Sequence, residues 1–222
     1  VCIAPKKFAL RRDIVRGVCS VGVPASIQNL LNVTGMTVLN NFTAVYEADA
    51  VAAMGIAQKI CMVPMYAAMG VGQAVMPLVG YNFAGGNARR MKEGFLFATK
   101  VSLAFQLLIV AVCCLFPASI MGLFIREGAI VAHGSRFLRG LVLAQPFLCM
   151  DFLAVGVFQA CGMGGKSLLF AVLRKVALEI PALVILNALF PLYGLAYAQF
   201  LTETILAAAA AVMLVRIFRE KA

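Results

Sequence analysis

The sequence contains no tryptophan and one histidine, and only 13% of its 222 residues are charged. Without tryptophan, an aromatic belt at a membrane–water interface would have to consist of tyrosine and phenylalanine. Hydrophobic residues are correspondingly abundant: they make up 63% of the chain, and its mean hydropathy is +0.97. A soluble domain of this length could not bury so much apolar surface. The composition therefore predicts an all-α integral membrane protein.

Motifs for enzymatic chemistry and metal binding are also missing. The seven cysteines are odd in number, form no CxxC pair and have no histidine companion, which disfavours a disulfide framework and a metal site. The lone His133 lies in a predicted loop, and there is no HExxH or GxSxG. The end of a phosphate loop is matched at Gly165-Lys166-Ser167, but Ala160 replaces the first glycine and a membrane span precedes it. A nucleotide site is therefore rejected.

Acidic residues are scarce beside basic ones, 9 against 19, which gives a net charge of +10. In a soluble protein this balance would suggest a nucleic-acid partner. Here the basic residues stand in short gaps between apolar spans, so they are interpreted as topology determinants and no nucleic-acid partner is expected.

Six apolar spans follow one another along the chain. They lie at about 18–41, 50–79, 95–118, 137–161, 175–192 and 195–216. Residues 1–17 mix basic and apolar side chains, which is typical of an amphipathic interfacial helix or of a linker, and residues 18–222 form the predicted transmembrane lobe. The absence of an initiator methionine suggests a piece of a longer polypeptide.

An even number of spans puts both ends and two loops on one side, and that side is strongly basic. It would carry Lys6, Lys7, Arg11, Arg12, Arg16, Arg89, Arg90, Lys92, Lys100, Lys166, Arg174, Lys175, Arg216, Arg219 and Lys221. The other side would carry only Arg126, Arg136 and Arg139. This imbalance predicts cytoplasmic ends, including the C-terminus, in a multi-pass protein of the cell membrane.

Polar side chains recur within the first two spans. Gln28, Asn29, Asn32 and Asn40 fall within an arc of about 120° on a helix. Such a stripe either lines a water-filled cavity or forms hydrogen bonds between helices. In the second span, Lys59 could reach the interface, pair with an intramembrane acid or contact substrate.

Three carboxylates lie inside the predicted spans. A charge at that depth is costly and is commonly kept for ion binding, proton transfer or pairing. Asp151 and Glu203 are therefore candidates for binding a coupling ion, with a structural hydrogen bond or a pair with Lys59 as the alternative for Asp151. Glu179, four residues after Lys175, is expected to form an ion pair at a helix end.

The second span ends in a distinctive pattern. We expect the helix to stop at Pro77 and the chain to turn through Gly80, Asn82, Gly85 and Gly86 before a basic cluster that begins at Arg89. This stretch resembles the multidrug and toxic compound extrusion (MATE) family, whose Gly-Ala order appears here as Ala84-Gly85. Further pieces that fit the resemblance are Gly22-x-Pro24, Gly55 with Lys59, Phe158-Gln159-Ala160-x-Gly162 before Lys166, and Pro181 after Arg174.

The resemblance implies a six-helix lobe, the C-terminal half of a twelve-helix transporter, whose partners are the N-terminal half and the lipid bilayer. It implies an antiporter that exports cationic and amphipathic small molecules in exchange for H⁺ or Na⁺, without another cofactor. Asp151 is similar in position to an acid that binds the coupling cation in some members. Where these members often carry a glutamate, the first span here offers Asn29 and Asn32.

The predicted substrate cavity combines the polar stripe with Lys59, Met62 and Met150, because methionines give an adaptable apolar wall. A flippase for lipid-linked precursors is the nearest alternative, but it would need a more cationic cavity, and Lys59 is the only expected intramembrane cation. A structural membrane subunit and a membrane-embedded enzyme are the alternatives from other classes.

Overall fold

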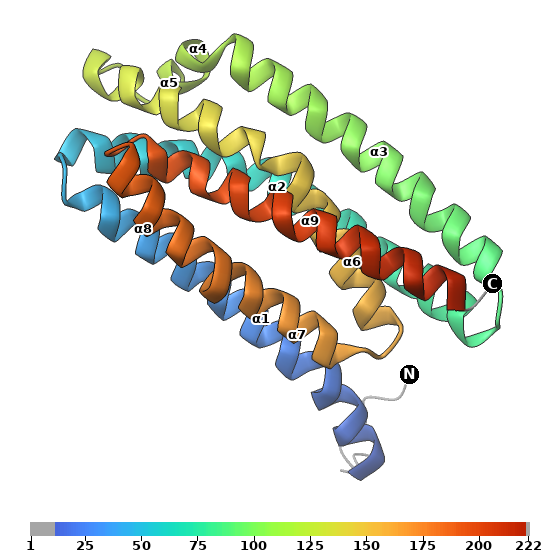
Figure 1. The fold of residues 1–222 in the computed structure, drawn as a ribbon. Coiled ribbons are helices and arrows are strands. Elements are labelled where there is room, and N and C mark those ends of the chain that lie inside the picture. The colour runs from blue at the N-terminus through green and yellow to red at the C-terminus, as the bar shows by residue number, and fades with distance from the viewer. Residues whose placement is uncertain (1–11, 221–222) are drawn as a thin grey trace, which may run out of the picture.

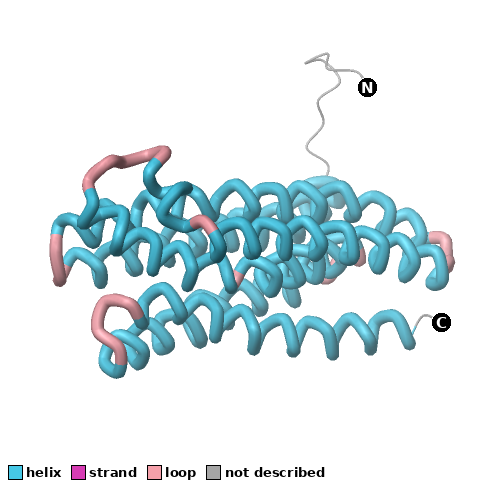
Figure 2. Tube along the Cα trace, turned by 90° about the horizontal axis from the view of Figure 1, so that it is seen from above, coloured by secondary structure: helices cyan, strands magenta, loops and turns pink. Residues whose placement is uncertain are grey.

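The computed structural model describes residues 12–220, and the described chain is helical apart from its turns (Figure 1). Its elements are α1 (Arg12–Ala44), α2 (Ala48–Ala84), α3 (Ala88–Leu115), α4 (Pro117–Gly122), α5 (Gly128–Leu143), α6 (Gln145–Ala160), α7 (Gly164–Val172), the π-helix η2 (Leu173–Glu179), α8 (Ile180–Leu189) and α9 (Gly194–Glu220). The long helices lie side by side, with their connections gathered at two opposite ends (Figure 2).

Five helical segments of the described chain are long and apolar enough to cross a membrane. They are α1, α2, α3, α9 and the pair α5–α6, which continues through the single residue Ala144. The segment α7–η2–α8 runs without a break from Gly164 to Leu189 and packs along α1. This architecture agrees with the predicted helical membrane lobe.

The predicted boundaries need three main corrections. The fourth span begins at Gly128 and not at 137, so His133 lies in α5 and not in a loop. The fifth span does not begin at 175 but at Gly164, and the second helix does not stop at Pro77 but continues to Ala84. A proline removes one backbone hydrogen bond, and membrane helices tolerate this loss where neighbouring groups support them. At Pro64 of α2, Gln106 of α3 donates to the proline's own carbonyl oxygen at 2.7 Å, which ties the two helices together beside the proline.

The turn after α2 depends on Gly86, one of the four residues predicted to form it. Gly86 has φ +71°, a left-handed conformation in which a Cβ would be strained. The turn is closed by a hydrogen bond from the Asn87 amide to the Asn82 carbonyl at 2.9 Å. A second glycine with φ +71°, Gly162, forms the matching turn between α6 and α7. Both connections are therefore tight helix stops.

Residues 1–11, which hold most of the predicted interfacial helix at 1–17, lie outside the described residues. From Arg12 onward the chain already belongs to α1. The interfacial helix or linker stays a prediction.

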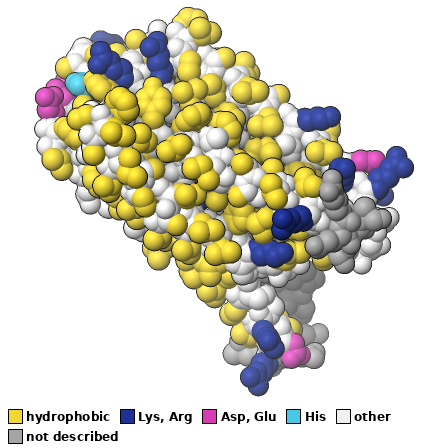
Figure 3. All heavy atoms as spheres, viewed as in Figure 1, with side chains coloured by type: hydrophobic (Ala, Val, Ile, Leu, Met, Phe, Trp, Pro, Cys, Tyr) yellow, Lys and Arg dark blue, Asp and Glu magenta, His cyan; other side chains and the backbone are white. Residues whose placement is uncertain are grey.

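The α5–α6 pair is the centre of the bundle. In this segment 78% of the most apolar window is buried, against 12–39% in the other four spans. Close packing against α2 is possible because two glycines face each other: a Cβ on Gly156 would stand 3.1 Å from the carbonyl oxygen of Gly72. On the face shown in Figure 3, hydrophobic side chains cover most of the helical bundle, as expected for contact with lipid.

The contact between α7 and α1 yields a first prediction. A Cβ on Gly164 would collide with the backbone carbonyl of Ser20, whereas nothing lies within 4 Å of a Cβ on Gly165. Gly164→Ala should therefore destabilise the protein by about 1–3 kcal/mol, while Gly165→Ala should be neutral or slightly stabilising, since alanine favours helix. Thermal unfolding in detergent measures both variants. Equal melting temperatures for the two would contradict the close approach of α7 to α1.

Candidate functional site

The described part of the bundle contains a buried ion cluster centred on Arg174 of η2. Its Nη1 donates to Asp151 Oδ2 of α6 at 2.9 Å, and its Nε lies 2.9 Å from Glu203 Oε1 of α9. All three residues are at most 2% exposed. One guanidinium thus joins three elements that are distant in sequence.

Two further groups hold the guanidinium in place. Its Nη2 donates to the side-chain oxygen of Asn32 on α1 at 3.2 Å. Its central carbon stands 5.4 Å from the ring centre of Phe152, within the range of a cation–π contact. Arg174 therefore also connects the cluster to α1.

The carboxylates are paired but not fully hydrogen-bonded. Glu203 lies close to Arg174 Nε without the alignment of a hydrogen bond, and neither of its oxygens has a hydrogen-bond partner among the described residues. Asp151 Oδ1 is also without one there. Buried acceptors left in this state are costly, and they offer places where a proton or a cation can bind.

A second ion pair lies on the same π-helix. Lys175 Nζ donates to both carboxylate oxygens of Glu179, at 2.8 and 2.6 Å, and both side chains are buried. The Lys175 ammonium and the Glu179 carboxylate both lie close to Gly35 of α1. A Cβ at Gly35 would stand 2.9 Å from the ammonium and 3.1 Å from Glu179 Oε1. The expected Lys175–Glu179 pair is therefore present in the structure, but deep inside the bundle and not at a helix end.

The π-helix explains how neighbouring cations can both face inward. Its hydrogen bonds link residue i to i+5, which changes the helical register, and such segments are frequent at functional sites. Within η2, Arg174, Lys175 and Glu179 are the buried residues. The local winding, and not the sequence spacing alone, directs these three side chains to one region.

This arrangement corrects the sequence-based charge map. The sequence pattern assigns Arg174 and Lys175 to a cytoplasmic loop, because two charges lower the hydropathy and push the apparent start of the span to 175. They lie inside the bundle, so Lys59 is not the only intramembrane cation. Lys59 itself is exposed, and among the described residues no ion pair with an acid is found for it.

The cluster contains more acid than base. The carboxylates of Asp151, Glu179 and Glu203 face the cations of Arg174 and Lys175. With all five ionised, one negative charge is unmatched, and an unmatched buried charge is strongly unfavourable. The cluster is therefore suited to binding one proton or one monovalent cation.

A cleft, which we call the charged cleft, opens beside the cluster; its empty space is about 570 Å³, with the open solvent at its mouth included. Arg174, Lys175 and Glu179 line it, and methionines form much of its apolar wall. The remaining lining residues are Asn32, Gly35, Met36, Leu39, Gln58, Cys61, Met62, Met65, Leu141, Gln145 and Gln199. Two buried amide groups in this wall, Gln58 Nε2 and Gln145 Oε1, have no hydrogen-bond partner in the described chain. They are a free donor and a free acceptor for a ligand.

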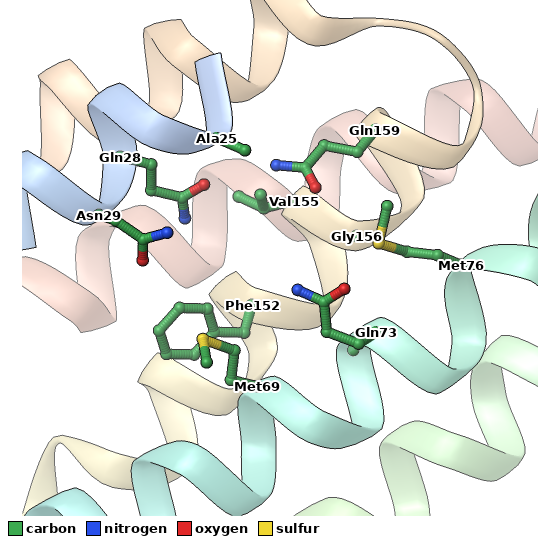
Figure 4. A pocket seen from close by; sticks show the side chains of 11 residues that line it. Ala25, Gln28, Asn29, Met69, Gln73, Met76, Phe152, Val155, Gly156 and Gln159 are labelled. Carbon is green, nitrogen blue, oxygen red and sulfur yellow. The ribbon is translucent and has the colours of Figure 1, made fainter. Parts of the chain in front are cut away.

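A second cleft lies between α1, α2 and α6 (Figure 4), with about 440 Å³ of empty space when the open solvent at its mouth is included. We call it the amide cleft, because carboxamides are its polar groups: Gln28, Asn29, Gln73 and Gln159. Met69, Met76 and Phe152 provide apolar surface. This cleft carries no charged lining residue among those described, in contrast to the charged cleft.

Four of the seven predicted cavity residues line one of these clefts. Asn32 and Met62 line the charged cleft, and Gln28 and Asn29 line the amide cleft. The remaining three, Asn40, Lys59 and Met150, line neither cleft. The two coupling candidates, Asp151 and Glu203, stand behind Arg174 in the buried cluster.

The residues of the predicted motif lie at the end of α2. Pro77, Gly80 and Asn82 are in the last turns of the helix, and Asn82 is buried with its amide donating to the Leu78 carbonyl at 2.8 Å. Gly85 caps the helix, and Arg89 forms an exposed pair with Glu93 at 2.9 Å. The motif therefore forms a connection between helices.

Sequence reasoning missed Arg174, Gln58 and Gln145 as site residues. A signal for Arg174 was available: residues 168–173 before it, LLFAVL, are apolar, and three intramembrane acids require a countercharge. Gln58 and Gln145 offered no comparable signal, because single amides in apolar spans are not distinctive.

A family model named MatE matches residues 24–185. The chain belongs to the MatE family. The predicted family is thus confirmed.

Curated relatives agree with this assignment. The chain is 33% identical over 215 residues to the multidrug export protein MepA of Staphylococcus saprophyticus, covering 95% of this chain and 46% of the relative. It is 32% identical over 212 residues to MepA of Staphylococcus aureus RF122, with the same coverage. The chain therefore spans about half the length of the curated relatives it matches. The MatE family and these relatives are transporters and not enzymes.

Solved structures show the same fold. An outward-facing multidrug resistance MATE transporter of the MOP superfamily superposes with a TM-score of 0.90 at 21% identity, over 100% of this chain and 50% of that one. A MOP superfamily transporter from Pyrococcus furiosus gives a TM-score of 0.90 at 22% identity, again over 50% of its chain. The chain has the fold of half a MATE transporter.

The Lys175–Glu179 pair yields a second prediction. Lys175→Gln should destabilise the protein by about 3 kcal/mol, because it leaves a buried carboxylate without its cation. The double variant Lys175→Gln/Glu179→Gln should recover most of this loss, since both charges disappear together. Thermal unfolding of the two single variants and the double variant in detergent gives the coupling. If the losses simply add, the pair is not energetically coupled.

Proposed function

We propose that the chain is one six-helix lobe of a cation-coupled antiporter that exports cationic and amphipathic compounds by alternating access. The observation that carries this proposal is the buried cluster with one unmatched negative charge beside a methionine-rich cleft. The coupling ion is H⁺ or Na⁺, and Asp151 and Glu203 are the residues proposed to bind it.

The similarity to MepA supports the substrate class. That protein is named a multidrug export protein, and this chain aligns with about half of it. Met36, Met62 and Met65 in the charged cleft suit varied apolar partners, because methionine is flexible and polarisable.

Coupling follows from competition for one charge. An ionised cluster attracts a cationic compound from the cleft, and a proton or Na⁺ that binds Asp151 or Glu203 removes this attraction. Binding of the coupling ion therefore favours release of the cationic compound, and the reverse. If the bound cation determines whether the transporter opens inward or outward, the two cations are exchanged across the membrane.

The other half of the transporter is proposed to be a second six-helix lobe that precedes this one. Two lobes of equal orientation would be related by an axis along the membrane normal, with substrate between them near the midplane. The approximately half-length match to the relatives fits this arrangement.

The orientation is also a proposal. The start of α1, the α2–α3 and α6–α7 turns and the end of α9 lie at one end of the bundle (Figure 1). Even without Arg174 and Lys175, these segments hold Arg12, Arg16, Arg89, Arg90, Lys92, Lys166 and Arg216. The positive-inside rule makes this end cytoplasmic.

A flippase for lipid-linked precursors is the second candidate. It is favoured by one observation, that Arg174 and Lys175 line the cleft and could contact anionic headgroups. Both cations are already bound to carboxylates, so the site as a whole is acidic. We therefore place the antiporter first.

The third prediction concerns ethidium efflux from energised cells that express the full transporter. Asp151→Asn should abolish gradient-driven efflux, because the buried cluster loses the charge that binds the cation. Collapsing the proton and sodium gradients separately identifies the ion. The matched control is Asp49→Asn, which removes the same charge from an exposed position in the first turn of α2 and should retain efflux.

Efflux that survives Asp151→Asn would move coupling to Glu203 or to the other half. Absence of ethidium efflux from the unmodified protein, together with uptake or translocation of an anionic lipid precursor, would replace the antiporter by the flippase.

A further inference from the structure

The electrostatic character of the charged cleft depends on very few side chains. From α1, α2, α5 and the start of α6 its described lining is neutral, with Cys61 as the one titratable group, a thiol that is uncharged at physiological pH. From α9 the lining residue is the neutral Gln199. The charges come from η2 and from the two acids behind it, Asp151 and Glu203.

Arg174 occupies a special position among these charges. It lines the cleft itself, whereas its two carboxylate partners stand behind it, buried from the cleft. The Lys175–Glu179 pair is neutral as a unit and contributes no net charge. Arg174 is therefore the group that reduces two negative charges, those of Asp151 and Glu203, to one.

We propose that Arg174 determines the valence of the transported compound. With Arg174 present, the charged cleft accepts compounds that carry a single positive charge. This inference rests on the proposed function and adds the substrate class to it. With Arg174 in place, one positive charge neutralises the site, and a second would be buried without a partner. Without it, two positive charges are needed for neutrality.

The size of the effect follows from Coulomb's law. At an effective dielectric constant of about 20, a full charge several ångströms away changes the affinity of a bound cation by about tenfold or more. The change in binding free energy is about twice as large for a doubly charged ligand as for a singly charged ligand, because the Coulomb energy is proportional to the charge of the ligand. The ratio of the two affinities therefore reports the charge of the site. A loss of folded protein or of packing lowers both affinities alike and leaves their ratio unchanged.

The fourth prediction uses two dyes with the same phenanthridinium ring, the singly charged ethidium and the doubly charged propidium. Binding of both to the purified full transporter is measured at pH 8, where protons compete least. We expect the unmodified protein to prefer ethidium. In Arg174→Gln the propidium-to-ethidium affinity ratio should rise by about tenfold, and in Arg174→Lys, which keeps the charge, it should stay near the original value.

The matched control is the double variant Lys175→Gln/Glu179→Gln. It alters the same π-helix and the same cleft wall but leaves the net charge unchanged, so the ratio should not move even if both affinities change. An unchanged ratio in Arg174→Gln, or an equal rise in this control, would overturn the proposal.

Arg174→Gln leaves two buried carboxylates without a cation, and it could fail to fold. Glu203→Gln then provides the test in the opposite direction, because it makes the site neutral. The propidium-to-ethidium ratio should fall by about tenfold, and a ratio that stays constant would refute the valence limit. Binding of neither dye by the unmodified protein would instead refute the proposed export of cations, and with it this inference.

Discussion

A charge buried among apolar helices must be matched by an opposite charge, and this constraint organises the structure around Arg174. Its guanidinium contacts Asp151 on α6, Glu203 on α9 and Asn32 on α1, while its own backbone belongs to η2. Removing Arg174 would leave two buried carboxylates without a cation in a medium of low dielectric constant. The ion cluster therefore connects four elements more specifically than apolar packing can.

The same cluster is arranged so that it can change its state. A fully satisfied buried network would be rigid, but here several carboxylate oxygens lack hydrogen bonds in the described chain and the acids outnumber the cations by one. A bound cation would improve this balance. The site thus combines strong connection between helices with a built-in demand for one more positive charge.

The two clefts show how one helix serves different chemical environments. Gln28 and Asn29 of α1 border a neutral, amide-rich cleft, whereas Asn32, about one turn further on, contacts Arg174 at the charged cleft. A compound passing along α1 would meet amides at one level and charges at the next. This change of environment along a single helix face suits ligands that combine polar and apolar parts.

The sequence by itself determined the membrane class, most of the spans, the glycine turn after α2, the family and the presence of intramembrane acids. These follow from hydropathy, from backbone sterics and from a local motif, all of which are readable along the chain. Only the tertiary structure decided that Arg174 and Lys175 lie inside the bundle, and which acids they bind. The physical reason is that hydropathy counts a buried ion pair as two polar residues. The acids that bind Arg174 stand 23 and 29 positions away in the sequence, and the acid that binds Lys175 lies one turn along the π-helix.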